Sequence, residues 1–153
     1  MRNISDIIES YLKQVIDSSG KGHIEIKRSG LADQFQCVPS QINYVINTRF
    51  TVERGYFVES KRGGGGYIRI VRVELHSKKD LIDEVIDQIG HSIPQTAAEH
   101  ILYRLHEEEI LTTREAKLVM AAIHRANLPI PLPQRDELRA ILLTAMLETL
   151  KFE

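Results

Sequence analysis

The sequence predicts an α+β protein that is mostly α, in two parts that meet near residue 73. Apolar residues recur at helical spacing over most of the 153 residues, and the alternating runs typical of β-strands occur only before Glu74. Residues 1–73 hold 11 Lys and Arg against 7 Asp and Glu, whereas residues 74–153 hold 9 against 14. The first part thus has a net positive charge and the second a net negative charge, which favours contact of the first part with a polyanion. Random scatter of surface charge can produce a difference of this size as well.

Composition restricts the class of protein. With 42% hydrophobic and 27% charged residues, the chain is of the ordinary globular kind. Its longest apolar stretches, such as 140–146, are far shorter than the ~20 residues of a membrane span, and the N-terminus lacks the apolar segment of a signal peptide. We therefore expect a cytoplasmic protein that does not bind membranes. The single cysteine, Cys37, excludes an internal disulfide and is expected to be a free, partly buried thiol.

The first predicted element is an amphipathic helix, followed by a short strand over 23–27. Asn3 can cap the helix, and Gly20 and Gly22 can end it. The residues at the i, i+3, i+4, i+7 spacing are Ile4, Ile7, Ile8, Tyr11, Leu12, Val15 and Ile16.

Two helices joined by a turn are predicted next. Ser29 can cap the first, the turn passes through Gln36 and Cys37, and Pro39 suits the first turn of the second. The residues expected in the core are Leu31, Ala32 and Phe35 from the first helix, and Ile42, Val45, Ile46 and Phe50 from the second helix and its end.

The outward face of the second of these helices is polar and has no acidic residue. It consists of Ser40, Tyr44 and Asn47, flanked by Gln41, Asn43 and Thr48. Uncharged side chains that donate and accept hydrogen bonds suit the reading of base edges in the DNA major groove, and Arg49 at the helix end can approach phosphates. A merely solvated polar face is the alternative. The helix-turn-helix arrangement favours DNA.

A hairpin is predicted from the strand-like runs 55–60 and 67–73. Its tip, residues 61–66, is basic and ends in four consecutive glycines, which weaken local structure by about 2 to 4 kcal/mol. Helix, strand, helix, helix, hairpin is the element order of a winged helix-turn-helix domain, for which we take residues 1–73. We call this tip, residues 61–66, the wing. Because its glycines have no side chains, the wing can enter the narrow minor groove, where Arg62 would meet concentrated negative potential.

The glycine run has two other interpretations. A phosphate-binding loop would end in GK[ST] and lead into a helix, and this run does neither. A flexible linker fits the composition, but linkers are not usually enclosed by matched strands.

Several stretches resemble a known family. CVPSQINYVINTRF (37–50) and ESKRGGGGYIRI (59–70) resemble the signature stretches of CtsR, the class III heat-shock repressors of low-GC Gram-positive bacteria, and 3–15, 114–117 and 135–140 are similar as well. The resemblance spans nearly the whole chain. It implies a homodimeric transcriptional repressor of genes for Clp chaperone and protease components, bound to a tandem direct repeat in double-stranded operator DNA.

The resemblance also implies roles for residues. The helix over 39–48 would read the major groove, and the wing would enter the minor groove and sense heat. Arg62 would be phosphorylated by a protein arginine kinase with its adaptor, which abolishes DNA binding, and the released repressor would be cleared by a Clp chaperone/protease. The candidate DNA-binding residues are Arg28, Ser40, Gln41, Asn43, Tyr44, Asn47, Thr48, Arg49, Lys61, Arg62, Gly63, Gly64, Gly65 and Gly66.

Residues 74–153 predict an all-α domain of about four helices. Gly90 can end the first, Pro94 precedes the second, and Thr112 with Glu115 forms a capping box that opens the third. The predicted helices lie over 81–89, 97–105, 116–123, with Ala116, Val119, Met120 and Ile123 inward, and 134–151, and a connector with three prolines over 128–134 precedes the last.

Four helices in about 80 residues bury little core alone, so we expect this unit to be a dimerisation domain. A monomeric ligand-sensing domain is the alternative, but no cluster of polar residues marks a pocket. His124 stands where we expect an acidic residue in the family, which puts a family-specific partner contact there in question.

We expect no catalytic residue, metal site or cofactor, and therefore no enzyme. His100 and His106 are six residues apart and point in different directions on a helix, and the other histidines are isolated. Glu107, Glu108 and Glu109 lie on successive faces and do not form an acid–base pair. A winged-helix module that binds protein or structured RNA is the alternative function, because the fold does not determine the ligand.

Overall fold

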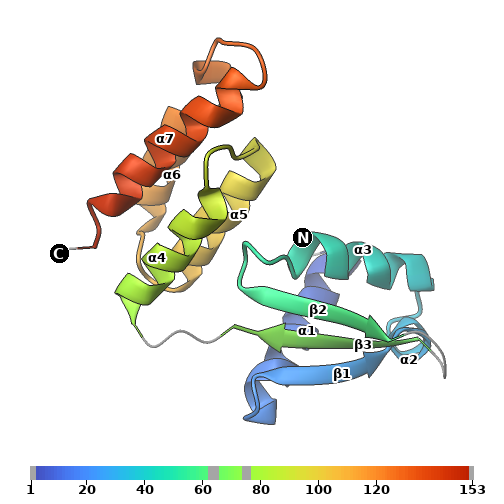
Figure 1. Ribbon diagram of the computed structural model, residues 1–153. Coiled ribbons are helices and arrows are strands. Elements are labelled where there is room, and N and C mark those ends of the chain that lie inside the picture. The colour runs from blue at the N-terminus through green and yellow to red at the C-terminus, as the bar shows by residue number, and fades with distance from the viewer. Residues whose placement is uncertain (1–2, 62–65, 74–76, 152–153) are drawn as a thin grey trace. The chain divides into compact units, whose positions relative to one another are not determined.

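The computed structural model describes residues 3–61, 66–73 and 77–151, with Lys61 described by its backbone alone. The chain divides into two compact units, residues 1–74 and residues 75–153. Within the described residues, the first unit combines helices with a sheet and the second is helical (Figure 1). The fold class is therefore the predicted one, α+β with mostly helices.

The first unit has the element order of a winged helix-turn-helix. Its elements are α1 (Ile4–Ser19), β1 (His23–Lys27), α2 (Arg28–Gln34), α3 (Pro39–Arg49), β2 (Tyr56–Lys61) and β3 (Tyr67–Arg72). The strands form one antiparallel sheet in the order β1-β3-β2. α3 packs against α1 and α2, and both of these also pack against β1.

The two ends of α1 follow from local sequence. Asn3 Oδ1 accepts a hydrogen bond from the Asp6 N–H at 2.9 Å, and Asp6 Oδ2 accepts one from the Asn3 N–H at 3.4 Å. These reciprocal bonds form a capping box. Gly20 ends the helix with φ of 68°, in the left-handed region that glycine adopts without strain. The predicted cap and stop are both confirmed.

The prediction that Ser29 caps α2 is wrong. The helix begins at Arg28, and its N-cap is Lys27, which makes no side-chain capping bond. Lys27 is still paired with Tyr67 at the end of the β1–β3 ladder, and the Arg28 N–H donates to the Gly66 carbonyl at 3.4 Å. The Gly66 carbonyl at the end of the sheet therefore satisfies one of the N–H groups that the first turn of a helix leaves without an intrahelical partner.

α3 is held by its apolar face. Pro39 occupies the first turn, as predicted, and Phe50 lies against Tyr56 in an edge-to-face arrangement with ring centroids 4.8 Å apart. Together with the sheet and the two preceding helices, these residues enclose one core. Its buried residues are Ile8, Leu12, Ile16, Ile24, Leu31, Ala32, Ile42, Val45, Ile46, Phe50, Tyr56, Ile68 and Ile70.

The described part of the second unit contains four α-helices and one short 3-10 helix. These are α4 (Lys78–Ile89), α5 (Gln95–Glu107), α6 (Thr113–Ile123), η1 (Arg125–Asn127) and α7 (Gln134–Glu148). The capping box predicted at Thr112 and Glu115 is present, with bonds of 2.8 and 3.1 Å. Among residues 3–61, 66–73 and 77–151, no helix combines the length and the apolarity that crossing a membrane requires.

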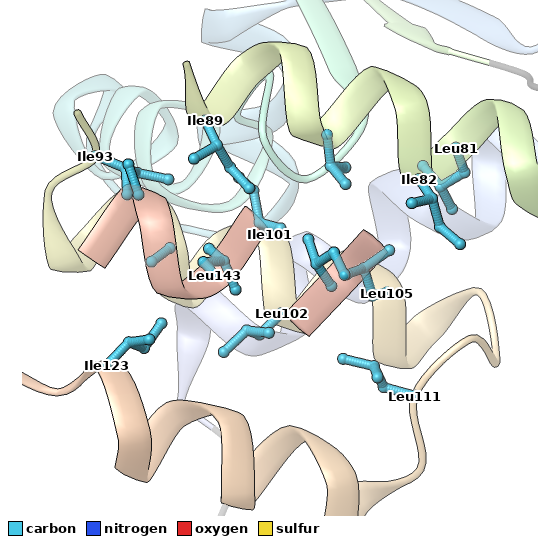
Figure 2. Packing of buried hydrophobic residues seen from close by; sticks show 14 residues of the cluster. Leu81, Ile82, Ile89, Ile93, Ile101, Leu102, Leu105, Leu111, Ile123 and Leu143 are labelled. Atoms are coloured by element: carbon cyan, nitrogen blue, oxygen red, sulfur yellow. The ribbon is translucent and has the colours of Figure 1, made fainter. Parts of the chain in front are cut away.

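All four α-helices contribute to the core of the second unit. Figure 2 shows the side chains of Ile82 from α4, Ile101 from α5, Ile123 from α6 and Leu143 from α7 in this core, and each is at most 2% exposed. Burying such a side chain stabilises a fold by about 1.5 to 3 kcal/mol. The other residues predicted to point inward from α6, which are Ala116, Val119 and Met120, are only half-buried at the edge of this core.

Arg139 of α7 is a buried cation in the second unit. Its side chain is 1% exposed, and its guanidinium donates to the carbonyl oxygens of Ile123 and Ile93 at 2.9 and 3.0 Å. It also forms an ion pair with Asp136. Because Ile123 is the last residue of α6, Arg139 satisfies a carbonyl group that the helix end leaves without an intrahelical partner.

We expect the Arg139→Ala substitution to destabilise the second unit by roughly 3 to 5 kcal/mol, because it leaves Asp136 and two carbonyl groups without their donor. Urea unfolding followed by circular dichroism measures this loss. Arg114→Ala, at an exposed position of α6, is the matched control. Equal small losses in both variants would contradict the role of Arg139.

Candidate nucleic-acid interface

The outward face of α3 is open to solvent in the first unit. Ser40, Asn43 and Asn47 are exposed, and so is Tyr44, with 54% of its surface accessible. The apolar residues on the opposite side of the helix are buried in the core, so the two faces are separated as the periodicity predicts. The exposed face offers hydroxyl and amide groups with no carboxylate among them.

Two residues expected to flank this face are bound within the protein. Gln41 is half-buried, and its Nε2 donates to Ser5 Oγ of α1 at 2.8 Å. The hydroxyl of Thr48 donates to the carbonyl of Tyr44, one turn earlier, at 2.6 Å. The structure therefore turns Gln41 toward α1 instead of the outward face, because buried Ser5 offers it a partner.

Arg49, which the sequence predicts to approach phosphates, is paired with two acidic residues of the protein itself. Its Nη1 lies 2.9 Å from Asp6 Oδ1 and 2.7 Å from Glu9 Oε1, and only 24% of its side chain is exposed. Asp6 and Glu9 are three residues apart on α1, so they lie on the same helix face, and both contact Arg49 at the end of α3. Arg49 thus ties α3 to α1. The acidic pair at this spacing is the sequence signal that indicates such a partner.

Glu9 is the centre of this charge cluster. Besides Arg49, its carboxylate contacts Lys13 at 2.8 Å and Arg54 at 3.9 Å, and the residue is 8% exposed. Burial alone raises the pKa of Glu9, but the hydrogen bonds and charges of Lys13 and Arg49 outweigh it and hold the pKa below its ordinary value. The hydrogen bond to Glu9 correspondingly raises the pKa of Arg49. Both groups are therefore charged at neutral pH.

Arg28 joins α3 to the base of the hairpin. Its Nε donates to Asn43 Oδ1 of α3 at 2.6 Å, and its Nη2 donates to Ser60 Oγ of β2 at 3.2 Å. The sequence places Arg28 among the candidates for DNA contact but gives no sign of this bridge. Its partners lie 15 and 32 residues away along the chain.

The hairpin is paired up to Lys61 and Tyr67, the last residues in register between β2 and β3. Gly66 enters β3 with φ of 71°, a left-handed conformation that strains any residue with a side chain. The other candidate residues of the wing, Arg62, Gly63, Gly64 and Gly65, and the side chain of Lys61 lie outside the described residues.

His106, His124 and Cys37 have ordinary surroundings. His106 Nε2 lies 2.9 Å from the hydroxyl of Thr113, and His124 Nδ1 accepts a hydrogen bond from the Ala126 N–H at the start of η1. Cys37 is a free, half-buried thiol. Within the described parts of the chain, no three His, Cys, Asp or Glu side chains are grouped so that they could hold a metal ion.

Comparison with known proteins identifies both units. Residues 3–74 match the CtsR N-terminal HTH domain, and residues 77–148 match the CtsR C-terminal dimerization domain. The transcriptional regulator CtsR of Geobacillus stearothermophilus is 58% identical over 153 residues, which cover 100% of both chains. That of Bacillus subtilis (strain 168) is 57% identical over 151 residues, which cover 99% of this chain and 98% of the relative.

A solved structure is similar over the same extent. It is a crystal structure of CtsR in complex with a 26-base-pair DNA duplex, with 58% sequence identity and a TM-score of 0.88. The similarity covers 99% of this chain and 100% of that one.

The Glu9–Arg49 pair predicts a specific dependence of stability on pH. Because folding lowers the pKa of Glu9, its contribution is fully present above the unfolded value of about 4.3 and is lost as pH falls through the lower folded value. We expect Glu9→Gln to destabilise the protein by about 1.5 to 3 kcal/mol at neutral pH. Below about pH 4 the difference from the unmodified protein should shrink.

Chemical denaturation at a series of pH values measures this difference. Glu59→Gln, at an exposed position of β2, is the control for loss of a carboxylate. A difference between Glu9→Gln and the unmodified protein that stays constant into acid would show that the Glu9 charge does not hold α3.

Proposed function

This chain belongs to the CtsR family, and from that premise we propose that it is a sequence-specific DNA-binding transcriptional repressor that acts as a homodimer. The observation that carries the proposal is the exposed face of α3, which has no acidic residue and adjoins the base of a glycine-rich hairpin. A relative with 58% identity was crystallised with a DNA duplex, which supports the same ligand class here.

In this proposal, α3 reads base edges in the major groove through Ser40, Asn43, Tyr44 and Asn47. Their amides and hydroxyls can donate and accept, as discrimination among base pairs requires. The hydroxyl of Thr48 bonds to a carbonyl group within α3 itself. Gln41 and Arg49 bond to α1, so we assign these two residues to holding the helix in place. They would act on affinity through the orientation of α3.

The wing, residues 61–66, would enter the adjacent minor groove. The paired strands β2 and β3 carry its base, and consecutive glycines keep side-chain bulk out of a groove only about 6 Å wide. Arg62 would then meet the phosphates and the negative potential of the groove floor.

We further propose that the repressed genes encode Clp chaperone and protease components, and that repression ends by two routes. Phosphorylation of Arg62 by a protein arginine kinase with its adaptor would place negative charge against DNA phosphates. Heat would act on the wing, because ordering it on DNA costs roughly 1 to 2 kcal/mol per residue in entropy, a term that grows with temperature. A Clp chaperone/protease in the cytoplasm would remove the released protein.

The second unit would form the dimer. Leu118 of α6 and Ile141 of α7 are exposed to 66% and 65%, and a second copy of the chain could cover them. Ile141 lies on α7 beside the small side chains of Ala140 and Ala145, and a second copy could pack closely there. A two-fold dimer naturally matches an inverted repeat, so a direct repeat requires the two DNA-binding units to be oriented differently relative to the dimerisation units.

Equilibrium binding to the 26-base-pair duplex of the CtsR crystal structure tests the function. We expect the protein to prefer this duplex at least roughly 1,000-fold over a shuffled duplex, and to lose affinity steeply with salt. Arg62→Ala should weaken binding to all duplexes and reduce the salt slope by about 1, whereas the control Arg114→Ala should change neither. Equal binding of both duplexes would contradict sequence-specific repression, and unchanged binding of Arg62→Ala would contradict insertion of the wing.

The wing also predicts how binding depends on temperature. Gly64→Pro or Gly65→Ala reduces the freedom of the unbound wing, so we expect affinity for the same duplex to fall less on warming than in the unmodified protein. Gly30→Ala, in α2, is a control for loss of a glycine elsewhere, because Gly30 has no left-handed φ and has room for a Cβ atom. If the wing variants and the unmodified protein lose affinity in parallel on warming, heat acts somewhere other than the wing.

A further inference from the structure

Arg28 lies where the sheet, α2 and α3 meet. It is the first residue of α2 and follows Lys27, which pairs with Tyr67 of β3. Its backbone N–H donates to the Gly66 carbonyl, and its side chain reaches Ser60 of β2, on the other side of β3. Arg28, which is half-buried as a residue, therefore spans the base of the wing from one edge of the sheet to the other.

Gly66 lies beside this guanidinium, where the wing returns to β3. A Cβ atom built at Gly66 would lie 3.7 Å from Arg28 Nη1, which is an ordinary van der Waals contact. The left-handed φ of Gly66, and not a lack of space, is what disfavours a side chain at this position.

The bond from Arg28 to Asn43 fixes the amide of Asn43. An asparagine amide has an acceptor end and a donor end of nearly the same shape, and either can face a ligand. Arg28 Nε donates at 2.6 Å to Oδ1, so Oδ1 is the end held by the protein and the NH₂ group is the end left to donate. A donor at an exposed position of α3 suits base acceptors in the major groove, such as guanine N7 and O6 or thymine O4.

We propose that Arg28 is a positioning residue that sets the orientation of Asn43 and links it through Ser60 to the base of the wing. This inference rests on the proposed function. It means that α3 and the wing read DNA as one unit, so that a change in the wing alters base preference at the position that Asn43 contacts. The guanidinium fork is essential, because it bonds two partners in fixed directions, which a lysine cannot do.

A direct contact of Arg28 with a phosphate is the competing role. Such a contact would add affinity for every sequence equally and would contribute to the salt dependence. Positioning of Asn43 instead affects discrimination at one base pair. The two roles therefore differ in which duplexes lose affinity.

The experiment uses the full-length protein, the 26-base-pair duplex of the CtsR crystal structure and a set of its single-base-pair variants. Affinities are measured for the unmodified protein, Arg28→Gln, Arg28→Lys, Asn43→Ala and the Arg28→Gln/Asn43→Ala double variant. We expect each single variant to lose roughly 10-fold in preference at the same base pair. The double variant should lose no more than Asn43→Ala alone.

Arg28→Lys separates charge from geometry. If Arg28 positions Asn43, this variant loses preference at that base pair although it keeps the charge. If Arg28 contacts a phosphate, Arg28→Lys binds almost as the unmodified protein does, Arg28→Gln weakens binding to all duplexes equally, and its effect adds to that of Asn43→Ala. That result would overturn the inference. So would an Asn43→Ala variant with unchanged preference at every base pair.

If the proposed function itself is wrong, the measured affinities will show this separately, because the unmodified protein will then bind all duplexes with equal affinity. Thermal unfolding of each variant checks its fold. If Arg28→Gln unfolds, Ser60→Ala tests the same link. This variant removes the hydrogen bond between Arg28 and β2 at the base of the wing and leaves the bond between Arg28 and Asn43. We expect it to reduce preference at the Asn43 base pair, and unchanged preference would overturn the link to the wing.

Discussion

The attachment of α3 to the rest of the first unit is the constraint on which the candidate interface depends. Its apolar side is buried through Ile42, Val45 and Ile46, and Arg49 fastens its C-terminal end to Asp6 and Glu9. A helix that reads bases must be held firmly, because a small shift would break short hydrogen bonds to several base edges at once. The same attachment pairs the basic residue at the end of the helix with two carboxylates of α1.

Charge is divided between the two units in a way that fits separate tasks. The first unit combines a net positive charge with a candidate interface of uncharged polar groups, so in the proposed function long-range attraction to a polyanion and short-range discrimination would come from different residues. In the second unit, the buried Arg139 bonds to the end of α6, to the Ile93 carbonyl and to Asp136 within the fold. That unit has a net negative charge, which disfavours non-specific contact with DNA.

The elements of the fold could be predicted because their signals are local. Helical spacing, the capping boxes at Asn3 and Thr112, and glycines at positive φ each involve residues within a few positions of one another. The predicted Ser29 cap failed because the partner of the Arg28 N–H is Gly66, which the sheet brings close. Helix periodicity alone contains no information about that contact.

The exposed face of α3 could be predicted from periodicity, whereas the directions of its long side chains could not. Gln41 reaches Ser5, 36 residues away, and Arg49 reaches Asp6, 43 residues away. A long polar side chain at the edge of a helix face can point to solvent or to a neighbouring helix, and the tertiary partner decides between them. The partners of Gln41, Arg49 and Arg28 therefore emerge only from the folded structure.

Dimethyl sulfate footprinting of the bound duplex tests the central claim most directly. The reagent methylates guanine N7 in the major groove and adenine N3 in the minor groove, and these are the two surfaces that α3 and the wing would cover. We predict protection of both kinds of atom, side by side within each half of the binding site. Protection of major-groove atoms alone, with neighbouring minor-groove adenines fully reactive, would contradict the account of helix and wing as one reading unit.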